Sequence, residues 1–459
     1  MTREEFEKTH PDYASSIEEW RFFMRSYFGG RFYRGGDYLL RHPFESAANY
    51  GRRKAIAYYY NYCAPIVDIM VSHLFKPAAK RDYGSFSKDP LFNSFLRDAD
   101  LEGTGFMQFM REAQRLSSVY GRVSIVVDKP AVRAATRAEA AAMDIRPYVS
   151  LVTPENLLDW SFVRSSSGKS VLDMVKILEA RDTCRVWTRQ GWEVWRMEKD
   201  AVSLVDSGEH GLGVVPVVNL YNKRSGMGMF GLSDIQDIAD INKNIYYLCS
   251  DAKEIIENTA FPMLALPYEK GAGEKEVGPK NILQFDPSEP NSRPYWLEAP
   301  HSSLTEIRQW VQQDIAEIFR IAKMGGVKAT EDSTQPRSGV ALELEQQQMH
   351  AALAEKADNV EHAEREVLKL WGMWEGLEFD GGIDYPDDFS VREIERDLEG
   401  AFRALDVGIE SRTFARELQK TIAAAVLPKL DETVKGEIMR EIDGSARMRE
   451  GGGHGHGNG

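Results

Sequence analysis

Two long amphipathic helical segments, separated by a proline-rich stretch, lie in the middle of this chain and constrain its fold most strongly. The first is expected over residues 234–259 and the second over residues 304–324, because apolar residues recur in both every three or four positions. The stretch between them, residues 261–300, holds seven of the 19 prolines and several short β-type runs. Paired helices carrying a small β insertion suit a protein that lines or frames something better than one with a catalytic pocket.

Local signals mark the ends of these two segments. Ser233 with Gln236, and Ser303 with Glu306, have the spacing of a capping box, in which two side chains satisfy free backbone N–H groups at a helix start. The glycine pair at 325–326 is expected to end the second helix. A lobe of about forty residues buries little core by itself, so the β insertion is expected to need a neighbour.

The first helical segment has a strongly acidic face. Its carboxylates outnumber its lysines, Lys243 and Lys253. Such a face could bind divalent cations, but exposure to solvent, or to a like-charged polymer that it does not hold, is the favoured interpretation. The acidic residues are Asp234, Asp237, Asp240, Asp251, Glu254 and Glu257.

The flanking regions divide by periodicity into helical and β parts. Helices are expected over residues 17–28, 52–75 with a kink at Pro65, and 104–120. Strands are expected over residues 123–127, 148–152, 171–178, 183–187, 192–195 and 214–220, with a hairpin turn at 189–191 and an exposed helical insertion at 131–143. A very long helix is expected over residues 338–375, then helices over 391–405, 411–425 and 430–447, and a disordered Gly/His tail.

Composition excludes several classes of protein. The formal charge of −14, from 57 basic and 71 acidic residues, argues against tight binding to nucleic acid through phosphates. Three scattered cysteines without metal-type spacing indicate a reducing compartment and no disulfides. No secretory signal opens the chain, and the most apolar stretch, residues 64–75, is too short and too polar to span a bilayer.

No motif establishes catalysis or metal binding. The run VRSSSGKS at residues 163–170 resembles the end of a P-loop, but Val163 replaces the first glycine and the residues that follow alternate like a strand. His454 and His456 lie in a glycine-rich tail without fixed geometry, and His350 and His362 are too far apart to share one metal. The loop at 325–337 reads equally well as an ordinary connector or as a mobile element that reaches into a channel. Tyrosines 58–60 and 62 are interpreted as packing residues in preference to a stacking platform.

Several long segments together resemble the portal proteins of tailed bacteriophages, and the resemblance covers nearly the whole chain. It rests on the order of the elements more than on one sharp motif. The segments are HPDYASSIEEWRFFMRSYFGG, YGRRKAIAYYYNYCAPIVDIMVSHLFKPAAKR, YVSLVTPENLLDW, FGLSDIQDIADINKNIYYLCSDAKEIIENTAFPMLAL and SGVALELEQQQMHAALAEKADNVEHAEREVLKLW.

The resemblance implies an α+β, portal-like fold that is mainly helical, with an α/β wing, a two-helix stem, a small β clip and a C-terminal helical crown. The implied parts are the wing at 1–232, stem helices at 233–260 and 302–324, the clip at 261–301, the tunnel loop at 325–337, the long wing helix and link at 338–389, the crown at 390–447 and the tail at 448–459.

The resemblance also implies a structural role, without catalysis, cofactor or metal. The chain would form a ring, a dodecamer in assembled virions, at one capsid vertex, and would be made in the host cytoplasm. Its partners would be the major capsid protein, the terminase large subunit, a head–tail adaptor and double-stranded DNA passing non-specifically, with no membrane. Candidate channel residues are Lys323, Lys328, Asp237, Asp240, Asp251 and Glu254, and candidate motor-docking residues in the clip are Lys270, Lys275, Lys280, Tyr295 and Trp296.

Two alternatives belong to other classes. A nucleotide-dependent enzyme of phage DNA processing would use Gly168, Lys169 and Ser170 and would bind nucleotide as an isolated protein. A minor capsid or scaffold protein without a channel would not form closed rings with a central hole.

Overall fold

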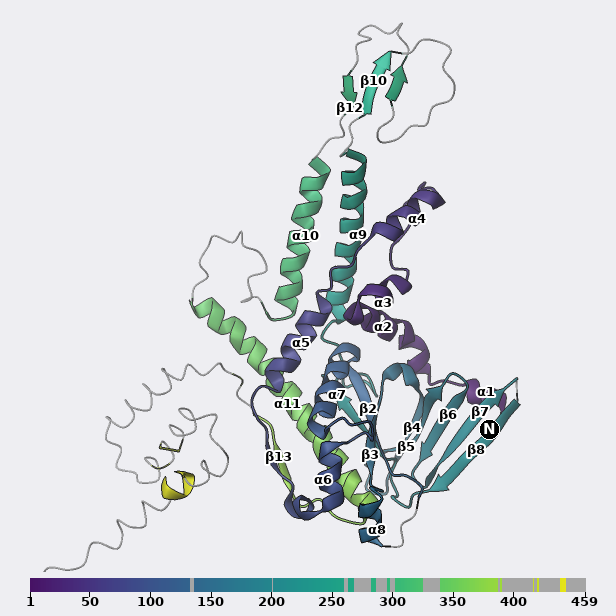
Figure 1. Ribbon diagram of the computed structural model, residues 1–459, viewed down its shortest axis with the longest axis vertical. Helices are drawn as coiled ribbons and strands as arrows, with labels where there is room; N and C mark the ends of the chain where they lie inside the picture. The colour runs from purple at the N-terminus through teal and green to yellow at the C-terminus, as the bar shows by residue number, and fades with distance from the viewer. Residues whose placement is uncertain are drawn as a thin grey trace, which may run out of the picture. The chain divides into compact units, whose positions relative to one another are not determined.

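The computed structural model describes residues 1–132, 136–199, 201–259, 263–267, 282–285, 295–297, 302–324, 339–386 and 389, and a few residues between 416 and 442. The chain divides into two units, residues 1–389 and 390–459. The expected C-terminal helices and the tail fall in the second unit, almost wholly outside the described residues, and the loop at 325–337 also lies outside them. The described part mixes helix and sheet, as the α+β expectation requires (Figure 1).

The first 120 residues are mainly helical. The expected helix at 17–28 is confirmed as part of α2, and the one expected at 104–120 is confirmed as α7, which begins two residues later than expected. The helices of this region are α1 Arg3–Glu7, α2 Pro11–Phe28, α3 Gly30–Gly35, α4 Ala47–Ile56, α5 Cys63–Leu74, α6 Pro90–Arg97 and α7 Phe106–Tyr120, with short 3-10 turns η1 Gly84–Lys88 and, later, η2 Pro154–Asn156.

The single kinked helix expected over 52–75 is wrong. Helix α4 ends at Ile56 and α5 begins at Cys63, with an extended stretch between them. Pro65 lies in the first turn of α5, where its missing N–H costs nothing. The extended stretch is held by Asn242, which accepts the Tyr62 N–H at 3.0 Å and donates to the Tyr60 carbonyl at 2.7 Å.

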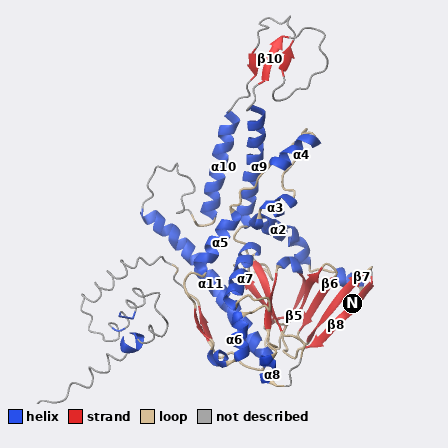
Figure 2. Ribbon diagram, viewed as in Figure 1, coloured by secondary structure: helices blue, strands red, loops and turns tan. Residues whose placement is uncertain are grey.

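Two antiparallel sheets follow. One has the order β3-β2-β9 and the other is a five-stranded meander, β4-β5-β6-β7-β8, whose strands lie side by side in Figure 2. All six expected strands and the hairpin turn at 189–191 are confirmed, whereas β4 and β8 were not expected. The bounds are β2 Arg122–Asp128, β3 Tyr148–Val152, β4 Leu157–Arg164, β5 Ser170–Ala180, β6 Thr183–Thr188, β7 Gly191–Glu198, β8 Ala201–Glu209 and β9 Val217–Tyr221, with helix α8 Arg137–Ala142 between β2 and β3.

The two long helices expected on either side of the β insertion are present. Helices α9, Gln236–Thr259, and α10, Ser302–Ile321, lie side by side (Figure 1). Between them the chain forms a three-stranded sheet of order β11-β10-β12, in which β10 pairs in parallel with β11 and antiparallel with β12. These strands are β10 Met263–Pro267, β11 Ile282–Phe285 and β12 Tyr295–Leu297.

The helix ends differ in detail from the expected ones. Ser233 Oγ accepts from the N–H of Ile235 at 3.1 Å, in place of the expected bond from Gln236. Helix α10 begins before Ser303 and ends at Ile321, ahead of the glycine pair. Its end is fixed by Lys323 at φ +58°, with the Met324 N–H bonded to the Phe319 carbonyl at 3.0 Å, which is a Schellman motif without glycine.

Helix α11, Gly339–Glu375, is confirmed as the long helix and contributes much of the core. Its buried residues Leu353, Val360, Val367 and Trp371 join a cluster with α2, α5, α7, the β2 sheet and α9. Two short strands, β1 Lys80–Asp82 and β13 Gly382–Asp384, pair antiparallel beside it. Among the helices that the structure describes, none combines the length and the apolar character needed to cross a bilayer.

Candidate functional site

The acidic face of α9 divides into two parts that differ in their surroundings. Asp237 and Asp240, near the start of the helix, have exposed side chains. Asp251 and Glu254, about three to five turns further along, are only partly exposed and are paired with the segment that contains α4. The four candidate channel carboxylates of α9 therefore do not form one uniform surface within this chain.

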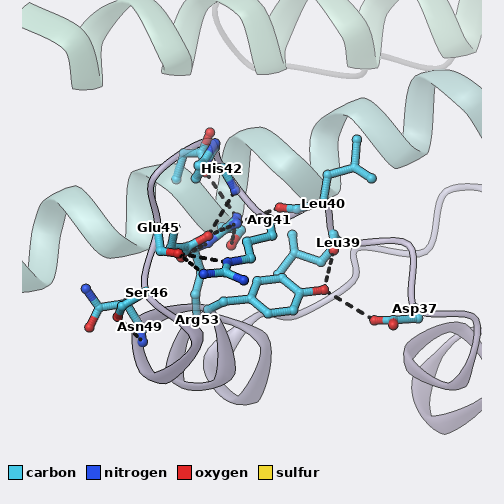
Figure 3. A network of polar contacts seen from close by, with 12 residues as sticks. Asp37, Leu39, Leu40, Arg41, His42, Glu45, Ser46, Asn49 and Arg53 are labelled. Carbon is cyan, nitrogen blue, oxygen red and sulfur yellow. Dashed lines mark hydrogen bonds and ion pairs between the residues drawn. The ribbon is translucent and has the colours of Figure 1, made fainter.

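Arg53 makes the central contact between α4 and α9 (Figure 3). Its side chain is 2% exposed, and its guanidinium donates to both carboxylate oxygens of Glu45 at 3.0 and 2.9 Å. It also lies 3.4 Å from the Asp251 carboxylate and donates to the Leu40 carbonyl at 2.6 Å. Because a buried guanidinium needs several acceptors, this set of bonds fixes α4 and the preceding loop against α9.

The same surface of α9 carries two further ion pairs. His42 Nε2 lies 3.0 Å from Asp251, and Arg52 contacts Glu254 at 2.6 Å and Glu257 at 3.5 Å. The hydrogen bonds from Arg53 lower the pKa of Glu45 to about 2. Sequence reasoning missed these basic partners, although carboxylates at 251, 254 and 257 lie on one helical face and the Arg-Arg pair at 52–53 was visible.

A second polar cluster joins α9 to α11. Lys356 on α11 is 5% exposed, and its Nζ lies 2.8 and 2.7 Å from the two carboxylate oxygens of Asp234. Asn222, just after β9, accepts from Lys356 and donates to Asp234 at 2.9 Å. Ser118 and Gln114 of α7 donate to the same Asn222 oxygen at 3.0 and 3.2 Å. This cluster ties three elements to the start of α9.

A cavity of about 190 Å³ lies beside this cluster. Its lining mixes cations and carboxylates, including Lys223, Lys323, Asp237 and Glu355, so it shows no preference for one charge. Lys323, one of the candidate channel residues, is exposed at the cavity wall just past α10.

The remaining candidate residues are placed only in part. Lys328, Lys270, Lys275 and Lys280 lie outside the described residues. Tyr295 and Trp296 lie in β12, where they pair with Ala265 and Leu264 of β10.

The segment that resembles a P-loop is a hairpin turn between β4 and β5. The Gly168 N–H bonds to the Ser165 carbonyl at 2.8 Å, the Ser165 N–H bonds to the Lys169 carbonyl at 2.8 Å, and Gly168 has φ +79°. Ser170 begins strand β5, so the helix N-terminus that cradles phosphate in a P-loop does not follow it. Among the described residues there is no group of three or more His, Cys, Asp or Glu side chains that could hold a metal ion.

Comparisons with known proteins match part of the chain to one family. Residues 234–375, from the start of α9 to the end of α11, match a family model described as a domain of unknown function, DUF4055. No curated protein matches.

The chain is similar to solved structures of gene transfer agent (GTA) particles. A chain of the virion of the native particle is 12% identical, with 89% of this chain and 93% of that chain covered and a TM-score of 0.44. A chain of the neck of the native particle, computed with C12 symmetry, is also 12% identical, with 90% of this chain and 94% of that chain covered and a TM-score of 0.44. A chain of the neck of the empty particle, computed with C6 symmetry, is 12% identical, with 85% of this chain and 98% of that chain covered and a TM-score of 0.44.

Proposed function

We propose that this chain is the subunit of a portal ring, the structural channel at one vertex of a tailed-phage-like particle through which DNA enters and leaves. The observation that carries the proposal is the α9–α10 pair with a small sheet inserted between its two helices. This is the layout that the sequence resemblance implies for a portal stem and clip. In this proposal α9 and α10 are the stem and residues 261–301 are the clip.

The exposed carboxylates of α9 fit a channel wall. Asp237 and Asp240 have no basic partner among the described residues, and they are exposed. Repeated around a ring, they would repel phosphates, so that DNA passes without being held. Asp251 and Glu254 contribute less, because Arg53 and Arg52 offset their charge. The candidate lysines, Lys323 and Lys328, would supply transient phosphate contacts.

The partners follow from the same proposal. The clip, with candidates Lys270, Lys275, Lys280, Tyr295 and Trp296, would dock the terminase large subunit and later a head–tail adaptor, while the rest of the ring contacts the major capsid protein. Hydrolysis of ATP would belong to terminase, because the turn at Gly168–Ser170 leads into a strand.

A clip deletion tests this proposal. Residues 261–300 would be replaced by a short Gly/Ser linker that lets α9 and α10 stay paired, and particles would be assembled with this variant as the only copy. We expect the packaged DNA to fall below detection, because the motor loses its docking surface or the ring fails to assemble. A matched control replaces only the exposed turn at 165–168. Normal packaging by the clip-deleted protein would contradict the proposal.

A further inference from the structure

The turn between α3 and α4 presents a phenylalanine in an unusual way. The side chain of Phe44 is fully exposed, with a relative accessibility of 106%, and its φ is +67°. The Glu45 N–H closes the turn on the His42 carbonyl at 3.1 Å. Pro43 at the second position and a positive φ at the third are features of a type II turn, whose third position favours glycine. A large apolar residue there is unfavourable both in its backbone and in its exposure to water.

The turn is also held firmly. Arg41 Nε donates to the Glu45 carbonyl at 2.8 Å, and the Glu45 carboxylate accepts the His42 N–H at 3.0 Å (Figure 3). Glu45 is in turn bonded to the buried Arg53, and His42 contacts Asp251 on α9. These bonds hold the backbone of the turn in one conformation, so Phe44 is exposed from an ordered turn.

Helix α10, on the other side of α9, exposes a large aromatic side chain that could pack against Phe44. Figure 1 shows α4 and α10 on opposite sides of α9, and both helices contact α9. Ile318 of α10 is fully buried, whereas Trp310 is 56% exposed. Helical spacing places Glu306 and Glu317 on the same face as Trp310.

The turn that contains Phe44 and the exposed Trp310 lie at nearly the same level along the axes of α9 and α10. Asn244 of α9 donates to Asp314 of α10 at 2.8 Å, which sets the register of the two antiparallel helices. Counting from that contact places Trp310 level with Leu248, less than one turn from Asp251, where the Phe44 turn is fastened. A second copy placed alongside without an axial shift would bring Phe44 of one chain near Trp310 of the next.

We propose that the His42–Glu45 turn docks Phe44 against Trp310 on α10 of a neighbouring copy of this chain. The contact is head-to-tail, as a closed ring requires, and it rests on the ring of the proposed function. Arg41 beside Phe44 and Glu306 beside Trp310 supply opposite charges at the rim of the contact. The aromatic pair supplies the buried centre.

Photocrosslinking from position 44 tests the contact in the full-length protein. Phe44 is replaced by p-benzoylphenylalanine, the assembled protein is irradiated, and crosslinked peptides are identified by mass spectrometry. We expect crosslinks between chains to the peptide that contains residues 302–321. The matched control carries the same group at Met227, an apolar residue that is 67% exposed, and should not crosslink to that peptide.

The possible outcomes separate this inference from the proposed function. Rings whose position 44 crosslinks to another segment, or to another particle protein, overturn the inference and leave the ring intact. A wild-type protein that forms no rings contradicts both. Crosslinking within one chain to α10 also overturns the inference.

A double-mutant cycle gives an independent readout. Phe44→Gly and Trp310→Ser should each weaken assembly about 10-fold or more, as measured by the protein concentration at which rings dissociate. Phe44→Gly also relieves the left-handed backbone, so lost assembly with an intact monomer fold separates docking from folding. The double variant should lose far less than the product of the single effects, and multiplicative effects would overturn a direct contact.

Discussion

Lys356 and Asp234 form a buried ion pair that joins the long helix α11 to the start of α9. Both carboxylate oxygens of Asp234 lie within hydrogen-bonding distance of Lys356 Nζ, and the two side chains are only 6% and 19% exposed. Asn222 connects the same pair to α7 and β9, so this cation helps to fix the start of α9.

Removing this cation should destabilise the protein strongly. Lys356→Met leaves the largely buried carboxylate of Asp234 with the Asn222 amide but without its cation, and breaking a buried ion pair lowers the free energy of unfolding by about 3 kcal/mol. Urea unfolding followed by tryptophan fluorescence measures the change. Lys369→Met is the control, because its pair with Glu366 on the same helix is half exposed and should contribute less than about 0.5 kcal/mol. Equal effects of the two variants would refute the role of Lys356.

Glycine at position 323 should stabilise the end of α10. Lys323 has φ +58° at the position of a Schellman motif where glycine is preferred. Lys323→Gly should raise the free energy of unfolding by about 1 kcal/mol through relief of the left-handed backbone. Lys323→Ala keeps the strain and serves as the control, with an expected change near zero. A midpoint of urea unfolding that falls for the glycine variant would contradict the assigned backbone conformation.

Acid should loosen the α4 segment from α9 over a defined range of pH. The hydrogen bonds from Arg53 lower the pKa of Glu45 from its ordinary value of 4.5 to about 2 in the folded protein. A carboxylate whose folded pKa is depressed stabilises the fold above its unfolded pKa, and this contribution is lost as the pH falls from about 4.5 towards 2. Hydrogen exchange, corrected for intrinsic rates, should show residues 45–56 opening faster across that range.

Two variants sharpen the test of Glu45. Glu45→Gln should show the faster opening already at neutral pH and should lose the dependence between pH 4.5 and 2. Glu18→Gln removes an exposed pair with Arg21 and should behave like the wild type. Protection of residues 45–56 that stays constant down to pH 2 would exclude Glu45 as the anchor.

The turn at Gly168–Ser170 should have no role in nucleotide binding. Lys169→Ala changes an exposed turn residue, so its effect on the free energy of unfolding should lie within about 0.5 kcal/mol. Calorimetric titration with Mg-ATP should show no binding for either the wild type or the variant. Micromolar binding that Lys169→Ala abolishes would favour the enzyme alternative instead.

Periodic segments could be predicted from the sequence because their burial is one-sided. The apolar spacing of α7 and α11 and the alternation of β2 follow directly from the faces that they bury. Strand β8 escaped prediction because it is an edge strand whose residues are nearly all exposed, so no alternation marks it. The split of α4 from α5 depends on Asn242, which lies about 180 residues further along the chain.

Of the candidate site, only the carboxylates of α9 could be predicted from the sequence, and not their basic partners. The acidic spacing of α9 is visible in the sequence, and so is the candidate stem. The partners Arg52 and Arg53 lie about 200 residues from Glu254 and Asp251, and no local pattern connects them. Pairings of this kind arise from the tertiary fold, so the sequence could indicate an acidic face of α9 without showing that Arg52 and Arg53 neutralise part of its charge.

The mass and shape of the purified protein show whether it forms the proposed ring. Twelve copies of the 52.0 kDa chain have a mass of about 624 kDa. We expect particles near that mass by native mass spectrometry, and rings with a central hole in negative-stain images. A monomer, or a compact dimer or tetramer without a hole, would contradict it.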